Sequence, residues 1–280
     1  MLRVRGFDLN TEPLGLRTLS YNEPGGPPRI TDYDPRKKTP RSIVFHSTSG
    51  GVTKLRKGRG PGGRAKTFAN YQVKTDRFVS WDGTIDTDAF TLWQNDPAEF
   101  YSWSATKWNS VCMGIEFVED SGSLYEEQIL AGVLLADILT ATFGIQRQIA
   151  WDSSANKVQG GVLPRADDKG KDGGASLVGV FAHFHNTTNR GAGDPGRFLF
   201  DALKDAGYEC FDMKRDPENP GAKRAEDQRV WAQRQAALGI TADGLPMLGT
   251  RNALKAAGKP LGMWVPRPCD AHLTTLAEFA

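Results

Sequence analysis

Three of the four histidines of this 280-residue chain stand in two short segments whose residue types suit a metal site. His46 ends one apolar run, and His183 and His185 follow another much later in the chain. Asp194 then comes in an Asp-Pro-Gly turn. Two imidazoles and one carboxylate leave the fourth position of a tetrahedral zinc ion open for water, as in catalytic rather than structural zinc sites. The spacing therefore predicts a catalytic zinc site.

The second histidine segment offers two candidate ligands, of which one is needed. His183 and His185 are two residues apart, so they would share a face if the preceding strand continued through them. The prediction favours His183 and keeps His185 as the alternative ligand. The other imidazole would then bind substrate or be structural. The competing interpretations are a core histidine at His46 and an ordinary turn aspartate at Asp194.

Glu116 lies within a predicted strand over residues 111–118, where apolar residues alternate with smaller ones. A glutamate inside an apolar strand is costly unless it is paired or functional. Its neighbours on the same face, Cys112 and Gly114, are small and leave room. Beside a zinc-activated water, this carboxylate would be a natural general base. The alternative is that this face of the strand is solvated.

These residues must be positioned by a mixed sheet covered by helices, because predicted strands and helices alternate along the chain. Strands are expected at 43–46, 70–81, 84–87, 111–118 and 177–182. Asp82-Gly83 is expected to be a hairpin turn. Helices are expected from Ser123, with Glu126 as capping-box partner, to Gly144, and over residues 198–206.

Composition excludes several other classes. A net charge of +2 gives no argument for nucleic-acid binding. Three scattered cysteines without Cys-x-x-Cys spacing argue against a disulfide framework and against a cysteine-rich zinc site. No stretch is long and apolar enough for a transmembrane helix, and no apolar signal region follows Met1. We therefore expect synthesis in the cytoplasm without a Sec signal and no insertion into a membrane.

Four segments in order resemble the zinc-dependent N-acetylmuramoyl-L-alanine amidases of the T7 lysozyme and peptidoglycan recognition protein type. Residues 43–48 resemble the strand that carries the family's first histidine. Residues 70–85, with Trp-Asp-Gly-Thr-Ile, resemble its hairpin, and residues 108–117, with Met-Gly-Ile-Glu, resemble its Gly-Ile-Glu strand. Residues 182–196 resemble its final Gly-His and Asp-Pro-Gly segment. Each motif alone is weak, but four in the same order are specific.

The resemblance implies a function for several residues. It implies zinc ligands and a catalytic carboxylate at His46, His183, Asp194 and Glu116. Tyr71 falls on a tyrosine that assists in some members. The family often has a cation two residues before the aspartate, where this chain has Ala192, so Arg190 is the nearest candidate oxyanion stabiliser. Trp103, Trp108 and Asn109 are candidate substrate contacts, with core or lid packing as the alternative for the two tryptophans.

A second resemblance concerns the end of the chain. Residues 231–255, with Leu-Gly, Asp-Gly and Gly-Thr in order, resemble a three-helix peptidoglycan-binding module; a generic helical hairpin is the alternative. The expected organisation is an irregular extension over 1–40, an amidase domain over 41–212, a linker over 213–225 and the helical module over 226–280.

The resemblance implies hydrolysis of the amide between the muramic-acid lactyl group and L-alanine. The expected partner is bacterial peptidoglycan, and the expected cofactor is Zn²⁺ bound to a monomer that acts on the cell wall. A phage endolysin, a delivered lytic enzyme and a cytoplasmic recycling amidase all fit the sequence. Alternatives are a non-catalytic peptidoglycan-binding protein and a zinc hydrolase with another peptide-like substrate.

Overall fold

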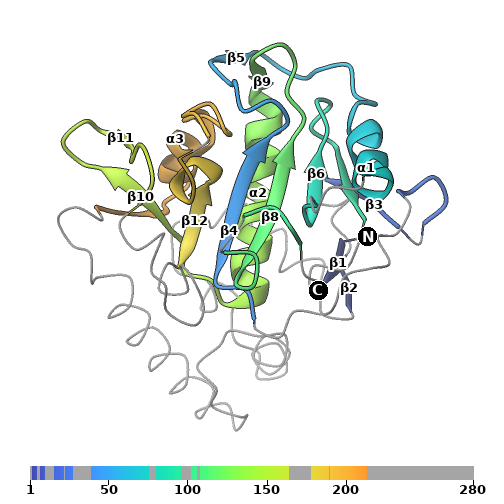
Figure 1. The fold of residues 1–280 in the computed structure, drawn as a ribbon, viewed down its shortest axis with the longest axis horizontal. Helices are drawn as coiled ribbons and strands as arrows, with labels where there is room; N and C mark the ends of the chain where they lie inside the picture. Colours follow the sequence, from blue (N-terminus) through green and yellow to red (C-terminus); the bar gives the residue numbers. More distant parts are fainter. Residues whose placement is uncertain are drawn as a thin grey trace, which may run out of the picture.

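The computed structural model has a mixed α/β fold in which one large sheet is covered by helices (Figure 1). It describes residues 2–4, 7–9, 16–21, 23–27, 39–75, 80–95, 102–105, 108–163, 178–188 and 190–212. The predicted fold class, a mixed central sheet covered by helices, is confirmed for this part of the chain. The linker over 213–225 and the helical module over 226–280 lie outside the described residues.

The described strands of the large sheet run in the order β11-β10-β12-β4-β8-β6-β7-β3, with β13 also paired to β10. The bounds of its four central strands are β12 (Gly179–Ala182), β4 (Ser42–Ser47), β8 (Cys112–Phe117) and β6 (Gly83–Ile85). These four strands are parallel. Their carboxyl ends therefore lie along one edge of the sheet, where sites of open α/β sheets form.

The remaining strands extend the sheet on both sides. They are β10 (Gln148–Asp152), β11 (Lys157–Val158), β13 (Glu209–Phe211), β7 (Thr91–Gln94) and β3 (Arg17–Ser20). The antiparallel pairs are β10 with β11 and β6 with β7. Two small sheets complete the described strands: β1 (Leu2–Val4) with β2 (Phe7–Leu9), and β5 (Lys54–Arg56) with β9 (Ser123–Tyr125).

Side-chain alternation divides the central strands between two environments. Ile43 and Phe45 of β4 join the main apolar core, and so do Ile115 and Phe117 of β8. Helix α2 (Glu126–Phe143), which runs behind β4 and β8 in Figure 1, and helix α3 (Phe198–Asp205) pack on this core. Because successive side chains of a strand point to opposite faces, His46 and Glu116 lie on the face away from α2.

The predicted helix over 123–144 is confirmed except at its start. Residues 123–125 form strand β9, and Tyr125 takes the N-cap position in place of Ser123. Gln128, three residues on, accepts a hydrogen bond from the Tyr125 backbone N–H at 3.0 Å, so the capping box is shifted from the predicted Ser123–Glu126 pair. The helix ends at Gly144, whose φ of 67° is the left-handed conformation that favours glycine at this position.

The predicted strand over residues 70–81 is wrong, because this segment begins as helix α1 (Ala65–Lys74). Ala65, Ala69 and Gln72 are its buried residues, spaced by four and three as on one helix face. The predicted turn at Asp82-Gly83 is also displaced: Gly83 begins β6, and the β6–β7 hairpin turns after Asp86, with Ala89 at a φ of 62°. Ala65 and Ala69 pack against residues of the sheet, whereas the apolar side chains on either side of Gln72 are exposed.

Segment 1–40 was expected to be irregular, but its described part contains three strands. β1 pairs with β2, and β3 pairs with β7 at one edge of the large sheet. Among the helices of the described residues, none combines the length and the apolar character that crossing a bilayer requires.

Candidate metal centre

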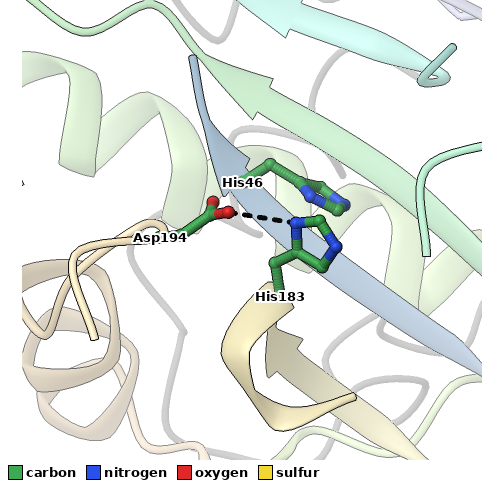
Figure 2. Close-up of side chains that lie close together, drawn as sticks. All are labelled: His46, His183 and Asp194. Atoms are coloured by element: carbon green, nitrogen blue, oxygen red, sulfur yellow. Dashed lines mark hydrogen bonds and ion pairs between the residues drawn. The ribbon is translucent and has the colours of Figure 1, made fainter. Parts of the chain in front are cut away.

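Three segments that are far apart in the sequence bring His46, His183 and Asp194 together (Figure 2). His46 is near the carboxyl end of β4, His183 begins the short 3-10 helix η3 (His183–His185), and Asp194 lies in the following loop. One potential ligand atom from each residue lies within 4.8 Å of the others, and all three side chains are buried. The three ligands predicted from the sequence thus form one cluster.

Hydrogen bonds fix the Asp194 carboxylate before any ligand binds. One of its oxygens, Oδ1, accepts a hydrogen bond of 2.7 Å from the backbone N–H of Ser47, next to His46. The other, Oδ2, lies 3.0 Å from His183 Nδ1. Ser47 Oγ also donates to the Gly193 carbonyl at 3.0 Å. The loop carrying Asp194 is therefore tied to the end of β4.

His183 and His185 do not share a face, because the chain leaves the strand and enters η3 at His183. His185 is fully buried, and both of its ring nitrogens have backbone partners. Nδ1 accepts from the Ala182 N–H at 3.1 Å, and Nε2 donates to the Gln159 carbonyl at 2.7 Å. The structure therefore places His183 in the cluster and gives His185 a structural environment.

Burial also controls the charge of His46. Desolvation, followed by electrostatic interaction with His183 and Arg190, lowers the pKa of His46 well below 6.5. A neutral imidazole has a free nitrogen lone pair, which is the form that binds a metal. Together with the carboxylate, these buried donors fit a divalent metal ion chemically.

Glu116 lies beside His46, on the neighbouring strand. The two residues are register partners in the parallel pair β4–β8 and point to the same face. Burial, and secondly the negative charge of Asp194, raise the pKa of Glu116 well above 4.5, while Arg190 opposes this shift. A bound cation would oppose it further, because opposite charge favours the ionised carboxylate. Glu116 is thus a buried carboxyl group beside the cluster of His46, His183 and Asp194, with a pKa raised toward the protonated form.

A cavity of about 530 Å³ opens over the cluster. The residues that line it are His46, Ser47, Thr48, Thr67, Phe68, Tyr71, Trp81, Ser104, Glu116, His183, Arg190 and Asp194. Thr67, Phe68 and Tyr71 come from α1. Thr67 and Phe68 were not predicted because the expected strand began only at residue 70, so the start of helix α1 went unrecognised. The spacing of Thr67 and Tyr71 by four residues is the helical signal.

Other predicted site residues have different environments. Tyr71 is 41% exposed on α1, and the Arg190 Nε lies 3.7 Å from Asp194 Oδ2; both line the cavity. Trp108 is buried against Phe181, and its ring centroid lies 5.4 Å from that of Phe181.

Asn109 is also buried, and its Oδ1 accepts a hydrogen bond of 2.6 Å from the Ala105 N–H. Trp103 is 39% exposed. Neither tryptophan nor Asn109 is among the residues that line the cavity.

No protein-family model and no curated protein matches this chain. Among solved structures it is similar to the N-acetylmuramoyl-L-alanine amidase LysC from Clostridium intestinale, at 14% identity and a TM-score of 0.37, over 68% of this chain and 95% of that one. It is also similar to the Drosophila peptidoglycan recognition protein SD, at 13% identity and a TM-score of 0.43, over 71% and 99% of the chains.

A mutant endolysin from Bacillus subtilis is a further similar structure, at 20% identity and a TM-score of 0.35, over 47% of this chain and 80% of that one. An amidase, an endolysin and a peptidoglycan recognition protein are thus among the solved structures that this chain resembles.

Proposed function

We propose that this chain is a zinc-dependent N-acetylmuramoyl-L-alanine amidase, which hydrolyses the amide between the lactyl group and L-alanine of peptidoglycan. The observation that carries the proposal is one cavity that holds both a buried three-ligand cluster and a separate carboxyl group. His46, His183 and Asp194 supply the ligands. Glu116 lines the same cavity. A ligand set beside a proton carrier is what metal-assisted amide hydrolysis requires.

Each residue has a separate task in this reaction. A zinc ion held by the three ligands would supply Lewis-acid activation of water and of the amide carbonyl. Glu116 accepts the proton that water loses as its oxygen bonds to the carbonyl carbon. It then passes this proton to the amide nitrogen as the carbon–nitrogen bond breaks, so that the amine leaves neutral.

Two further side chains of the cavity can stabilise the negative charge that develops on the carbonyl oxygen. The Arg190 guanidinium is close to the cluster but 45% exposed, so it can turn toward a substrate. The Tyr71 hydroxyl offers a hydrogen-bond donor from α1, on another wall of the cavity. Either group would act where the family's usual cation, replaced here by Ala192, is missing.

The substrate class rests on the four ordered sequence motifs over residues 43–196 and on the predicted wall-binding module over 226–280. We propose that the protein acts on the cell wall as a phage endolysin or as a lytic enzyme delivered to it. The second candidate, a peptidoglycan-binding protein without activity, would not need both a complete ligand set and Glu116.

Mass spectrometry of purified cell walls digested with and without EDTA tests the proposal. We expect release of L-alanine amino termini from peptidoglycan, loss of this release in EDTA and recovery when zinc is added. The variant His46→Ala is the matched control and should remain inactive with zinc. Binding to cell walls without new amino termini would support the non-catalytic alternative, and EDTA-resistant cleavage by metal-free protein would rule out the zinc mechanism.

A further inference from the structure

Two polar atoms at the candidate metal centre are buried without a hydrogen-bond partner. They are His46 Nε2 and Ser104 Oγ, and both are unsatisfied within the part of the chain that the structure describes. An unpaired buried polar group is costly, which suggests that each of these two atoms has a partner in the working protein. Both residues line the same cavity.

Both atoms lie close to Gly114 of β8, the strand next to the one that carries His46. A Cβ atom on Gly114 would overlap the Ser104 side chain, including its Oγ, and would lie 3.5 Å from His46 Nε2. Only glycine leaves this space open, because any other residue would place a carbon atom on the Ser104 side chain and in contact with the imidazole. Gly114 therefore allows Ser104 and His46 to approach each other.

Hydrogen bonds hold the segment that carries Ser104 in place on both sides. The Trp103 N–H donates to Ser80 Oγ at 2.9 Å, and the Asn186 amide donates to the Ala105 carbonyl at 2.8 Å. Asp82 Oδ2 accepts a hydrogen bond of 2.8 Å from Ser102 Oγ and one of 2.7 Å from the backbone N–H of Gly114. The position of Ser104 above β8 is thus fixed by its neighbours rather than by its own hydroxyl.

The orientation of the His46 ring leaves Nε2 available for this hydroxyl. In Figure 2, one nitrogen of His46 lies beside the His183 ring and faces the Asp194 side of the cluster. The two imidazole centroids are 4.3 Å apart. Since Nε2 is the nitrogen close to β8, we assign Nδ1 as the nitrogen on the side of His183 and Asp194.

We propose that Ser104 is a positioning residue whose hydroxyl accepts a hydrogen bond from His46 Nε2–H, directly or through one water molecule. This inference rests on the proposed function, because it assigns His46 as a metal ligand. Metal-binding histidines usually donate their second ring N–H to an oxygen, which fixes the tautomer and the orientation of the ring. A proton held on Nε2 would leave the Nδ1 lone pair of His46 free to bind a metal ion held with His183 and Asp194. His185 and Gln159 form the corresponding kind of bond away from the site.

Zinc titration of the full-length chain tests this proposal without an activity assay. Ser104→Ala is expected to raise the dissociation constant for zinc by about tenfold to a hundredfold, the usual effect of losing such a partner. Ser123→Ala is the matched control, because Ser123 Oγ is also buried and unpaired but does not line the cavity. Equal zinc affinities for Ser104→Ala and the unchanged protein would overturn the proposal.

Nitrogen NMR of the metal-free protein, with ¹⁵N-labelled histidine, provides the second readout. We expect neutral His46 to carry its proton on Nε2, and Ser104→Ala to shift the ring toward the Nδ1–H tautomer. A tautomer that does not respond to Ser104→Ala contradicts the inference. If Ser104→Ala has both effects while the unchanged protein leaves peptidoglycan intact, the amidase proposal fails and the role of Ser104 stands.

Discussion

His183 and His185 show how two identical side chains, two residues apart in the sequence, can lie in different environments. His183 faces Asp194, whereas both nitrogens of His185 are bonded to the backbone. We expect His183→Ala to lose zinc binding and peptidoglycan cleavage. His185→Ala should retain zinc but unfold more easily, by about 2–4 kcal/mol, because it leaves a cavity and an unpaired carbonyl. Zinc titration and denaturant unfolding of both variants separate these effects; zinc loss in His185→Ala with an intact fold would contradict the assignment.

His185 also predicts how stability depends on pH. Burial lowers the pKa of His185 from 6.5 to about 4, so between these values the unfolded chain binds the proton and the folded chain does not. Its contribution to stability is therefore complete above pH 6.5 and is lost as the pH falls toward 4. The loss amounts to about 3 kcal/mol. In urea unfolding, His185→Gln should remove this part of the pH dependence; a parallel pH profile for both proteins would refute the explanation.

Glu116 carries the prediction for the chemical step. Because it is a proton carrier and not a ligand in the proposed reaction, Glu116→Gln should still bind zinc. Its kcat should fall by about 10²- to 10⁴-fold, the usual contribution of general acid–base catalysis. Metal analysis and cleavage of muropeptides measure the two properties on the same sample. Full activity of Glu116→Gln would mean that another group moves the proton.

At the scale of elements, β8 must leave space for the segment above it. Gly114→Ala should lower stability by about 1–3 kcal/mol, because its Cβ would overlap Ser104. It should weaken zinc binding as well, since His46 Nε2 is next to the same position. Gly160→Ala is the control, because a Cβ there meets nothing within 4 Å. Thermal unfolding and zinc titration check both variants, and a neutral Gly114→Ala would show that the overlap is relieved at no cost.

Strand β4 could be predicted because it is a short continuous apolar run, and β8 because its apolar residues alternate with a period of two. The strand predicted over residues 70–81 was wrong because only the last few residues of helix α1 fall in this range. A stretch this short does not show whether apolar residues follow a helical or a strand period. That His46, His183 and Asp194 lie together could be predicted from residue type and spacing. Ser104 could not, because its relation to His46 depends on a loop crossing over Gly114, and nothing local in the sequence encodes that crossing.

At the scale of the whole molecule, the three proposed ligands come from a central strand, a 3-10 helix and a loop, so a bound metal would link these elements. A metal that binds only the folded chain stabilises it by about 2.7 kcal/mol at a hundred times its dissociation constant. For a domain of this size we expect zinc to raise the Tm by about 5–10 °C. Calorimetry with and without zinc measures the shift, and His46→Ala should abolish it; an equal shift in that variant would place the metal elsewhere.

The register pairing of His46 with Glu116 ties chemistry to the way the sheet is assembled. A slip of β8 by one residue would turn Glu116 toward the core behind the sheet and bring an apolar side chain to the cavity. A substitution on this strand therefore changes one side chain. A single residue inserted or deleted before Glu116 instead turns this proposed proton carrier away from the cavity. Single substitutions can therefore adjust this site step by step, whereas a change in the register of β8 alters every side chain that the strand presents to the cavity.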